Sequence, residues 1–218
     1  MNFKKVKNRL FKGIQELVIT EGFLFNKKDE LFEKNVQGGI VYFYFLHTKW
    51  PDEINFQLWW GVRIDCIADI YNMVTEKDKA YFHLTEVLSN NLGRLIDYVD
   101  NGNEFSRADP QKYTILKEED VDTVISEVLA DIRKYILPYF EQNVSIEKID
   151  QILNRYPREL IIHNFIYPNK SMMGLIAAKL TKNPRYNQLI SIYDEELAEA
   201  AEDAKREYEK LKELLSKM

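Results

Sequence analysis

Few residues of this sequence carry side chains that perform chemistry by themselves. The histidines are His47, His83 and His163, and the single thiol is Cys66. A zinc site needs three or four such ligands, usually with two of them close together in the sequence. Because even Cys66 and His83, the closest of these residues, are far apart, the sequence predicts no metal site and no cofactor.

Cys66 and His83 are also the candidates for a nucleophile and its general base. No signature of a cysteine hydrolase surrounds Cys66. Its neighbours Ile64, Ile67 and Ile70 are typical of the surroundings of a small buried residue. We therefore expect this thiol to be buried and unreactive.

The acidic residues Glu118, Glu119, Asp120 and Asp122 form a third candidate group. Consecutive residues of a helix point in different directions, so these carboxylates are not expected to converge on one substrate or ion. They are better placed to stabilise the positive end of a helix that begins there. The sequence has no Gly-rich phosphate loop, nucleophile elbow or zinc-protease helix motif, and we predict no catalytic residue.

Aromatic residues indicate binding more than catalysis. Tyr42, Tyr44, Trp59 and Arg63 lie on two predicted strands. If helices cover only the opposite face of the sheet, these side chains face solvent, as residues at the centre of interfaces often do. If a later helix covers this face too, Trp59 belongs to the core. These four are the predicted binding residues.

An antiparallel sheet must position these side chains. Apolar and more polar residues alternate strictly from Ile54 to Ile64, which predicts a strand with one buried face. A hairpin is predicted within 23–36, a further strand at 40–47 and an amphipathic helix at 3–20. The fold class is therefore α+β, with an antiparallel sheet of about 4–6 strands packed against helices.

The middle of the chain has weaker patterns. Residues 65–74 either continue the preceding strand or form a short helix, and another strand is predicted near 82–88, followed by a turn at 89–91. A helical stripe begins at Glu118, and Pro138 should end or kink that helix.

The C-terminal third is predicted to be helical. Helices are expected at 146–153 and 170–180, with a long last helix from Pro184 to about Lys217. We divide the chain into an α+β core domain, 1–145, and a helical extension, 146–218, that packs on or beside it.

The last helix carries a stripe with the spacing of a coiled-coil seam. Its members are Leu197, Ala201, Ala204, Tyr208, Leu211 and Leu215. The stripe is expected to pack within the chain or against a second copy, so a homodimer through the C-terminal helix is one predicted assembly.

The composition excludes several classes of protein. The 218 residues are 45% hydrophobic and 30% charged, with a net charge of -5, which predicts a globular protein and argues against a general nucleic-acid binder. The longest apolar run, Ile40 to Leu46, is too short to span a membrane. A single cysteine suits a reducing compartment, and the N-terminus has no signal-peptide pattern. We expect a cytoplasmic protein that binds neither nucleic acid nor membrane.

Several short segments resemble the bacterial family known as domain of unknown function 4304. The segments are Gly22–Lys28 (GFLFNKK), Leu31–Lys34 (LFEK) and Phe56–Val62 (FQLWWGV), and in looser form Leu92–Ile96 (LGRLI), Ile136–Phe140 (ILPYF) and Leu175–Leu180 (LIAAKL). They span most of the chain in the same order. The resemblance implies an α+β fold and supplies no established activity or catalytic residue.

Two functions remain open at this point. The first is a non-catalytic protein-binding module, for example an immunity-like protein that neutralises a toxin, whose acidity would suit a basic partner. The alternative is an enzyme or small-ligand-binding protein with a pocket between sheet and helices, using dispersed residues such as Arg63, His83 and Tyr113. A concave pocket with convergent polar groups would favour the second.

Overall fold

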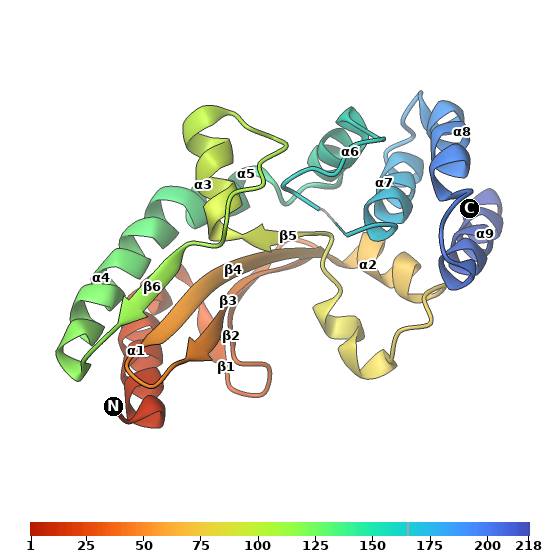
Figure 1. Cartoon of the computed structure of the whole chain (residues 1–218). Coiled ribbons are helices and arrows are strands. Elements are labelled where there is room, and N and C mark those ends of the chain that lie inside the picture. The colour runs from red at the N-terminus through yellow and green to blue at the C-terminus, as the bar shows by residue number, and fades with distance from the viewer. Residues whose placement is uncertain (165) are drawn as a thin grey trace. The chain divides into compact units, whose positions relative to one another are not determined.

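The computed structural model describes residues 1–164 and 166–218. The fold is α+β, as predicted, with an antiparallel sheet, a helical C-terminal region and a long last helix (Figure 1). The described residues divide into two compact units. The first comprises 1–36, 40–61 and 90–141, and the second comprises 37–39, 62–89 and 142–218.

The sheet has the strand order β1-β2-β3-β4-β5, and β6 also pairs with β4. Its strands are β1 (Leu24–Asn26), β2 (Leu31–Val36), β3 (Gly39–Lys49), β4 (Ile54–Ile64), β5 (Leu88–Asn91) and β6 (Lys112–Ile115). The predicted hairpin is β1 and β2, which pair antiparallel with Phe25 opposite Phe32. In β6, Tyr113 lies opposite Phe56 of β4.

The alternation in β4 has the predicted consequence. All residues of the apolar set, Ile54, Phe56, Leu58, Trp60, Val62 and Ile64, are buried, and at the end of the strand Gly61 and Arg63 are buried as well. The intervening Asn55, Gln57 and Trp59 are only partly buried. A shift of the strand by one residue would bring the amides of Asn55 and Gln57 into the core, so this pattern fixes the register.

The helices of the first unit are α1 (Phe3–Val18), the short 3-10 helix η1 (Ile19–Glu21), α3 (Leu92–Asn101), a 3-10 turn η3 (Glu118–Asp120), α4 (Val121–Asp131), the π-helical segment η4 (Ile132–Ile136) and α5 (Leu137–Gln142). Among them, α1 contacts β1 and α4 contacts β6. Helices α1 and α4 lie side by side (Figure 1). A Cβ atom on Gly13 of α1 would come within 2.5 Å of the Ile125 side chain of α4, so glycine allows this close approach.

Pro138 changes the helix that contains it, as predicted. Proline has no N–H to donate within a helix. The turn before it widens to π-helical geometry, in which Leu137 N–H donates to the carbonyl of Ile132. The chain then continues as α5, so the proline alters the helical geometry without ending the helix.

The second unit is built around a central helix. Its helices are α2 (Asp65–Asn72), the 3-10 segment η2 (Lys79–Leu84), α6 (Ile146–Arg155), α7 (Asn169–Leu180), α8 (Tyr186–Leu197) and α9 (Glu202–Ser216). All residues of α7 from Lys170 to Ala178 are buried, because α2, α6, α8 and α9 all pack against it. A helix that is apolar on all sides is typical of such a central position.

Three local predictions need correction or completion. The strand expected near 82–88 is wrong, because residues up to Leu84 form the 3-10 segment η2. The strand lies instead at β5, which includes the residues predicted as a turn. Residues 65–72 are helical, the second of the two alternatives. Helix α3 was not predicted; the side chain of Asn91 caps it by accepting from Arg94 N–H at 3.0 Å.

The range predicted for the last helix, 184–217, contains two helices. The helix is interrupted at residues 198–201, where the backbone of Ala201 is extended. A continuous helix of this length would be about 50 Å long at about 1.5 Å per residue and would run past α7. The break lets both α8 and α9 pack on α7. Tyr208, Leu211 and Leu215 of the predicted seam are thereby buried within the single chain.

The predicted domain boundary at residue 145 lies close to residue 141, where the chain last leaves the first unit. Residues 62–89, however, group with the C-terminal helices. The division into a core domain, 1–145, and a helical extension, 146–218, stays a prediction.

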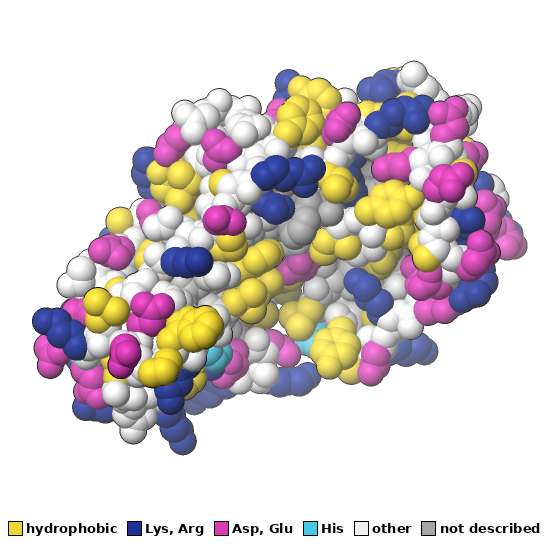
Figure 2. Space-filling model, in the orientation of Figure 1, with side chains coloured by type: hydrophobic (Ala, Val, Ile, Leu, Met, Phe, Trp, Pro, Cys, Tyr) yellow, Lys and Arg dark blue, Asp and Glu magenta, His cyan; other side chains and the backbone are white. Residues whose placement is uncertain are grey.

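The described helices include none that is long and apolar enough to cross a bilayer. The face drawn in Figure 2 mixes hydrophobic side chains with acidic and basic ones. Mixed charge of this kind is typical of a solvated surface.

Truncation after Ala200 tests the role of α9. The first unit should stay folded, because α9 belongs to the second unit. The second unit should lose about 5 kcal/mol of stability, since each large buried side chain contributes about 1.5–3 kcal/mol. Urea denaturation, monitored by circular dichroism, measures the stability of both units. Truncation after Ser216 is the matched control. A truncated chain that does not fold at all would show that the first unit also depends on α9.

Candidate functional site

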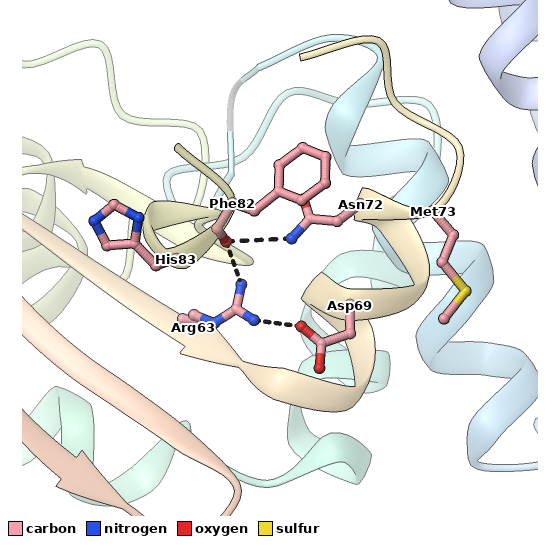
Figure 3. A pocket seen from close by; sticks show the side chains of 6 residues that line it. All are labelled: Arg63, Asp69, Asn72, Met73, Phe82 and His83. Carbon is pink, nitrogen blue, oxygen red and sulfur yellow. Dashed lines mark hydrogen bonds and ion pairs between the residues drawn. The ribbon is translucent and has the colours of Figure 1, made fainter. Parts of the chain in front are cut away.

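An open hollow of about 430 Å³ lies on the second unit, and we call it the Arg63 hollow. Its lining comes from the end of β4, from α2 and from η2 (Figure 3). The lining residues are Arg63, Asp69, Asn72, Met73, Phe82 and His83.

The guanidinium of Arg63 organises this site. Arg63 is 8% exposed, and its Nε donates to Asp65 Oδ1 at 3.0 Å. Nη2 donates to Asp69 Oδ1 at 2.5 Å. Asp65 and Asp69 are one turn apart on α2, so both carboxylates reach the same cation. The strand end and the helix that follows it are thereby held together.

A backbone carbonyl completes the arrangement. The carbonyl oxygen of Phe82 accepts from Arg63 Nη1 at 2.8 Å and from Asn72 Nδ2 at 3.2 Å (Figure 3). Thr85 Oγ1 in turn donates to Asn72 Oδ1 at 2.7 Å. These bonds fix η2 against α2, and they explain why residues 82–84 do not form the strand that their composition suggested.

Two carboxylates reach solvent at the rim of the hollow: Asp69 lines it, and Asp65 is bound to the lining residue Arg63. The side chains of Asp65 and Asp69 are 53% and 59% exposed, whereas that of Arg63 is 10% exposed. One buried cation is thus balanced by two carboxylates that reach solvent. Because all three guanidinium nitrogens of Arg63 donate within the chain, its role here is to hold α2 and η2 in place.

The segment that leads into η2 is held by α9. Glu207 Oε1 accepts from Thr75 Oγ1 at 3.1 Å and from the N–H of Glu76 at 2.6 Å. Glu76 also pairs with Arg206 at 3.4 Å and with Lys210 at 3.5 Å. The conformation of residues 75–78 therefore depends on the docking of α9.

The four predicted binding residues differ in burial and do not all belong to one unit. Tyr42 is buried, while Tyr44 and Trp59 are partly buried, all in the first unit. The Tyr42 ring packs on Gly61, where a Cβ atom would come within 2.6 Å of it. Arg63 belongs to the second unit and is buried among its ion-pair partners, so the alternative in which it faces solvent does not hold for this residue. The binding role of the other three stays a prediction.

The residues proposed for a dispersed enzyme site are also divided. Arg63 and His83 line one hollow, but Tyr113 is buried in the first unit, where its hydroxyl donates to Asp131 at 2.7 Å. The hydroxyl is held by that carboxylate, and burial is the main cause that raises the pKa of Tyr113.

Other candidates from the sequence, His47, Glu118 and Asp122, contact residues of helix α1. His47 packs against Phe3 with ring centroids 4.9 Å apart, and burial lowers its pKa. Glu118 pairs with Lys5 and Asp122 pairs with Arg9, so these carboxylates contact α1. Among the described residues, no group of three or more His, Cys, Asp or Glu residues could hold a metal ion.

Sequence reasoning missed the apolar residues around the hollow. Met73 and Tyr81 are 69% and 64% exposed, and Phe82 is partly buried. The strand predicted at 82–88 gave no indication of how these apolar side chains are arranged. A usable signal was present in Asp78, whose side chain accepts from Ala80 N–H at 2.9 Å and caps η2.

No family model matches the chain, and no curated protein or solved structure gives a significant match. The resemblance to domain of unknown function 4304 therefore stays a prediction.

Cys66 should react slowly with thiol reagents in the folded protein. The residue is partly buried rather than fully buried, and burial raises the pKa of its thiol. Less thiolate is therefore present at neutral pH than in an unfolded chain. Alkylation by iodoacetamide at pH 7.5, with and without urea, measures the difference. Equal rates in the two conditions would contradict this.

His163 should make stability depend on pH. It is 3% exposed, and burial, followed by Lys148 and Arg155, lowers its pKa to about 3. Between about pH 6.5 and pH 3 the unfolded chain binds a proton that the folded chain does not, so stability falls as pH falls. From pH 7 to pH 5 this amounts to about 2 kcal/mol.

In urea denaturation at pH 7 and pH 5, the variant His163→Gln should lack this contribution to the pH dependence of stability. The variant His83→Gln is the control, since His83 is exposed. An unchanged slope in His163→Gln would show that His163 is protonated in the folded state.

Proposed function

We propose that this chain is a non-catalytic protein-binding module, and that its partner contacts the surface around the Arg63 hollow. The observation that carries the proposal is the exposure of Met73, which lines this hollow, and of Tyr81, which directly precedes the lining residue Phe82 in η2. Interfaces are enriched in Tyr and Met relative to other protein surfaces, and large exposed apolar side chains gathered in one place often mark a contact site.

Charge supports a basic partner. The carboxylates of Asp65 and Asp69 reach solvent at the rim, and the whole chain has a net charge of -5. Complementary charge speeds association and rejects partners of the same sign. A cytoplasmic immunity protein that neutralises a basic toxin is one specific form of this proposal.

A small-ligand-binding protein or enzyme is the second candidate. It is favoured by the polar side chains of Arg63, Asn72 and His83 around a hollow of about 430 Å³, a volume that fits a small ligand. The bonds from Arg63 to Asp65, Asp69 and Phe82 weigh against it, because a ligand would have to compete with them for the guanidinium.

The test is affinity capture from the native host with wild-type chain and with the double variant Met73→Asp, Tyr81→Asp. We expect the wild type to capture a basic protein, and the variant to bind that protein at least tenfold more weakly. The control is the double variant Leu24→Asp, Leu116→Asp, whose parent side chains are 60% and 62% exposed in the first unit.

Thermal denaturation of all three proteins checks that folding is unchanged. If the Met73 and Tyr81 variant captures the partner as well as the wild type does, the partner binds elsewhere. If the control variant alone loses the partner, the contact surface lies on the first unit.

A further inference from the structure

The part of the sheet that belongs to the first unit has an outer face that is only partly covered. Because side chains alternate along a strand, Gln57 and Trp59 of β4 lie opposite its buried apolar set. Three large apolar side chains of the same unit, Leu46, Trp50 and Leu116, are 47%, 56% and 62% exposed. Figure 2, in the orientation of Figure 1, shows hydrophobic side chains at the surface over β4 and β6. Exposed apolar side chains that gather on one face often mark a binding site.

The register of β4 and β6 places polar and apolar side chains next to one another on this face. Lys112 lies opposite Gln57, and Thr114 lies opposite Asn55. Thr114 Oγ1 donates to Asn55 Oδ1 at 2.7 Å, so both side chains are on the same face. Leu116 directly follows the strand, and the alternation places it on this face as well.

The pairing of β3 with β4 extends the face on the other side. Trp50 N–H donates to the carbonyl of Glu53 at 2.8 Å, so these residues lie opposite each other across the turn. The Tyr42 ring packs on Gly61. Even-numbered residues of β3 therefore share the face with odd-numbered residues of β4. We define the outer sheet face as the surface formed by Leu46, Trp50, Gln57, Lys112, Thr114 and Leu116.

The backbone of β4 is not open to a ligand at this face. The strand pairs with β3 on one side and with β6 on the other. A peptide that binds by adding a strand needs an unpaired edge, which supplies main-chain hydrogen bonds. Recognition at the outer sheet face therefore has to come from side chains.

The polar side chains of this face are balanced in charge. Among the described residues, the side chains of Gln57 and Lys112 form no hydrogen bond or ion pair, so they can bind a ligand without breaking a contact. Glu53, on the same face, offsets the charge of Lys112, and its Oε1 accepts from Asn55 Nδ2 at 2.8 Å. This arrangement suits an uncharged ligand that offers several donors and acceptors.

The dimensions of the face argue against a second copy of the chain as the occupant. Strands lie about 4.8 Å apart, and side chains on one face repeat about every 6.8 Å. Three strands and the four alternate positions from Glu53 to Trp59 therefore cover about 27 by 14 Å, or about 400 Å². A stable dimer buries about 800 Å² of each copy. The face therefore suits a narrow ligand.

We propose that the outer sheet face binds a short, unbranched, uncharged oligosaccharide of β-1,4-linked hexoses with equatorial substituents. Such sugar rings present C–H bonds on both flat faces. These C–H groups carry a small positive charge and contact the electron-rich face of Trp50. The amide of Gln57 and the ammonium of Lys112 bind hydroxyl groups at the ring edges. This site is separate from the Arg63 hollow, which lies on the second unit.

Cellopentaose is the probe, titrated into the full chain and followed by backbone amide chemical shifts. We expect saturable shifts in β3, β4 and β6. Maltopentaose contains the same glucose units in a coiled chain, so it should bind more weakly. A chitosan pentamer is flat but positively charged, and it should also bind more weakly because its ammonium groups meet Lys112.

The variant Trp50→Ala should weaken the binding of cellopentaose about tenfold, because it removes the ring that contacts the sugar. Trp50→Phe should restore most of that binding. Tyr81→Ala is the matched control, since Tyr81 is an exposed aromatic residue of the second unit, and it should bind as the wild type does. Melting temperatures of these variants should equal that of the wild type, because both parent side chains are exposed.

The proposal is overturned if cellopentaose gives no saturable shifts, if the shifts lie outside β3, β4 and β6, or if Trp50→Ala binds as tightly as the wild type. Sedimentation equilibrium provides an independent check. A dimer that Trp50→Ala dissociates would also overturn the proposal, because the face would then join two copies. Equal binding of maltopentaose would overturn the choice of a flat β-1,4-linked chain.

Discussion

A buried cation that must be neutralised determines the organisation around the Arg63 hollow. Arg63 is placed at the end of β4, where its guanidinium is removed from water. Isolated buried charges are too costly to persist, so Asp65 and Asp69 have to converge on it. That requirement explains why residues 65–72 form a helix directly after the strand. Removing Asp69 alone would leave the guanidinium partly uncompensated, which is more destabilising than the loss of a surface ion pair.

A second buried polar network fixes the C-terminal helices. Asp150 of α6 accepts from Asn154 of the same helix and from Thr181 and Asn183, which follow α7. Asn154 also donates to the carbonyl of Gly174 at 2.8 Å. A Cβ atom on Gly174 would come within 2.7 Å of Asn154 Oδ1, so no larger residue fits this contact. The hydroxyl of Tyr193 of α8 donates to Asn154 Oδ1 at 2.5 Å, so the network joins α6, α7 and α8 and specifies how they pack.

Patterns with a short period in the sequence predicted the fold well. The alternation in β4 correctly predicted that its six apolar residues are buried, though Gly61 and Arg63 are buried too. The predicted apolar stripe of α1 was Val6, Leu10, Ile14, Leu17 and Val18, and all of these except Leu17 are buried. Both signals depend only on which face of an element meets the core. Such signals are local, so they can be interpreted without knowledge of the rest of the fold.

The failures share a dependence on contacts between distant residues. Segment η2 is shaped by bonds from Arg63 and Asn72, which the sequence of η2 does not reveal. The break between α8 and α9 contains no glycine or proline, and it follows from the need to fold back on α7. The sequence analysis left the exposure of Arg63 open because it did not use the acids two and six positions later, a spacing that brings both carboxylates to Arg63 only if 65–72 is a helix.

Because Glu207 of α9 bonds to residues 75–76, the docking of α9 is thermodynamically linked to the conformation of the segment that leads into η2. Whatever stabilises the docked position of α9 also stabilises the hydrogen-bonded conformation of this segment. By reciprocity, a partner that prefers this conformation beside Met73 and Tyr81 must also stabilise the docked position of α9. Hydrogen exchange in the last helix can therefore report an event at a surface to which that helix contributes no lining residue.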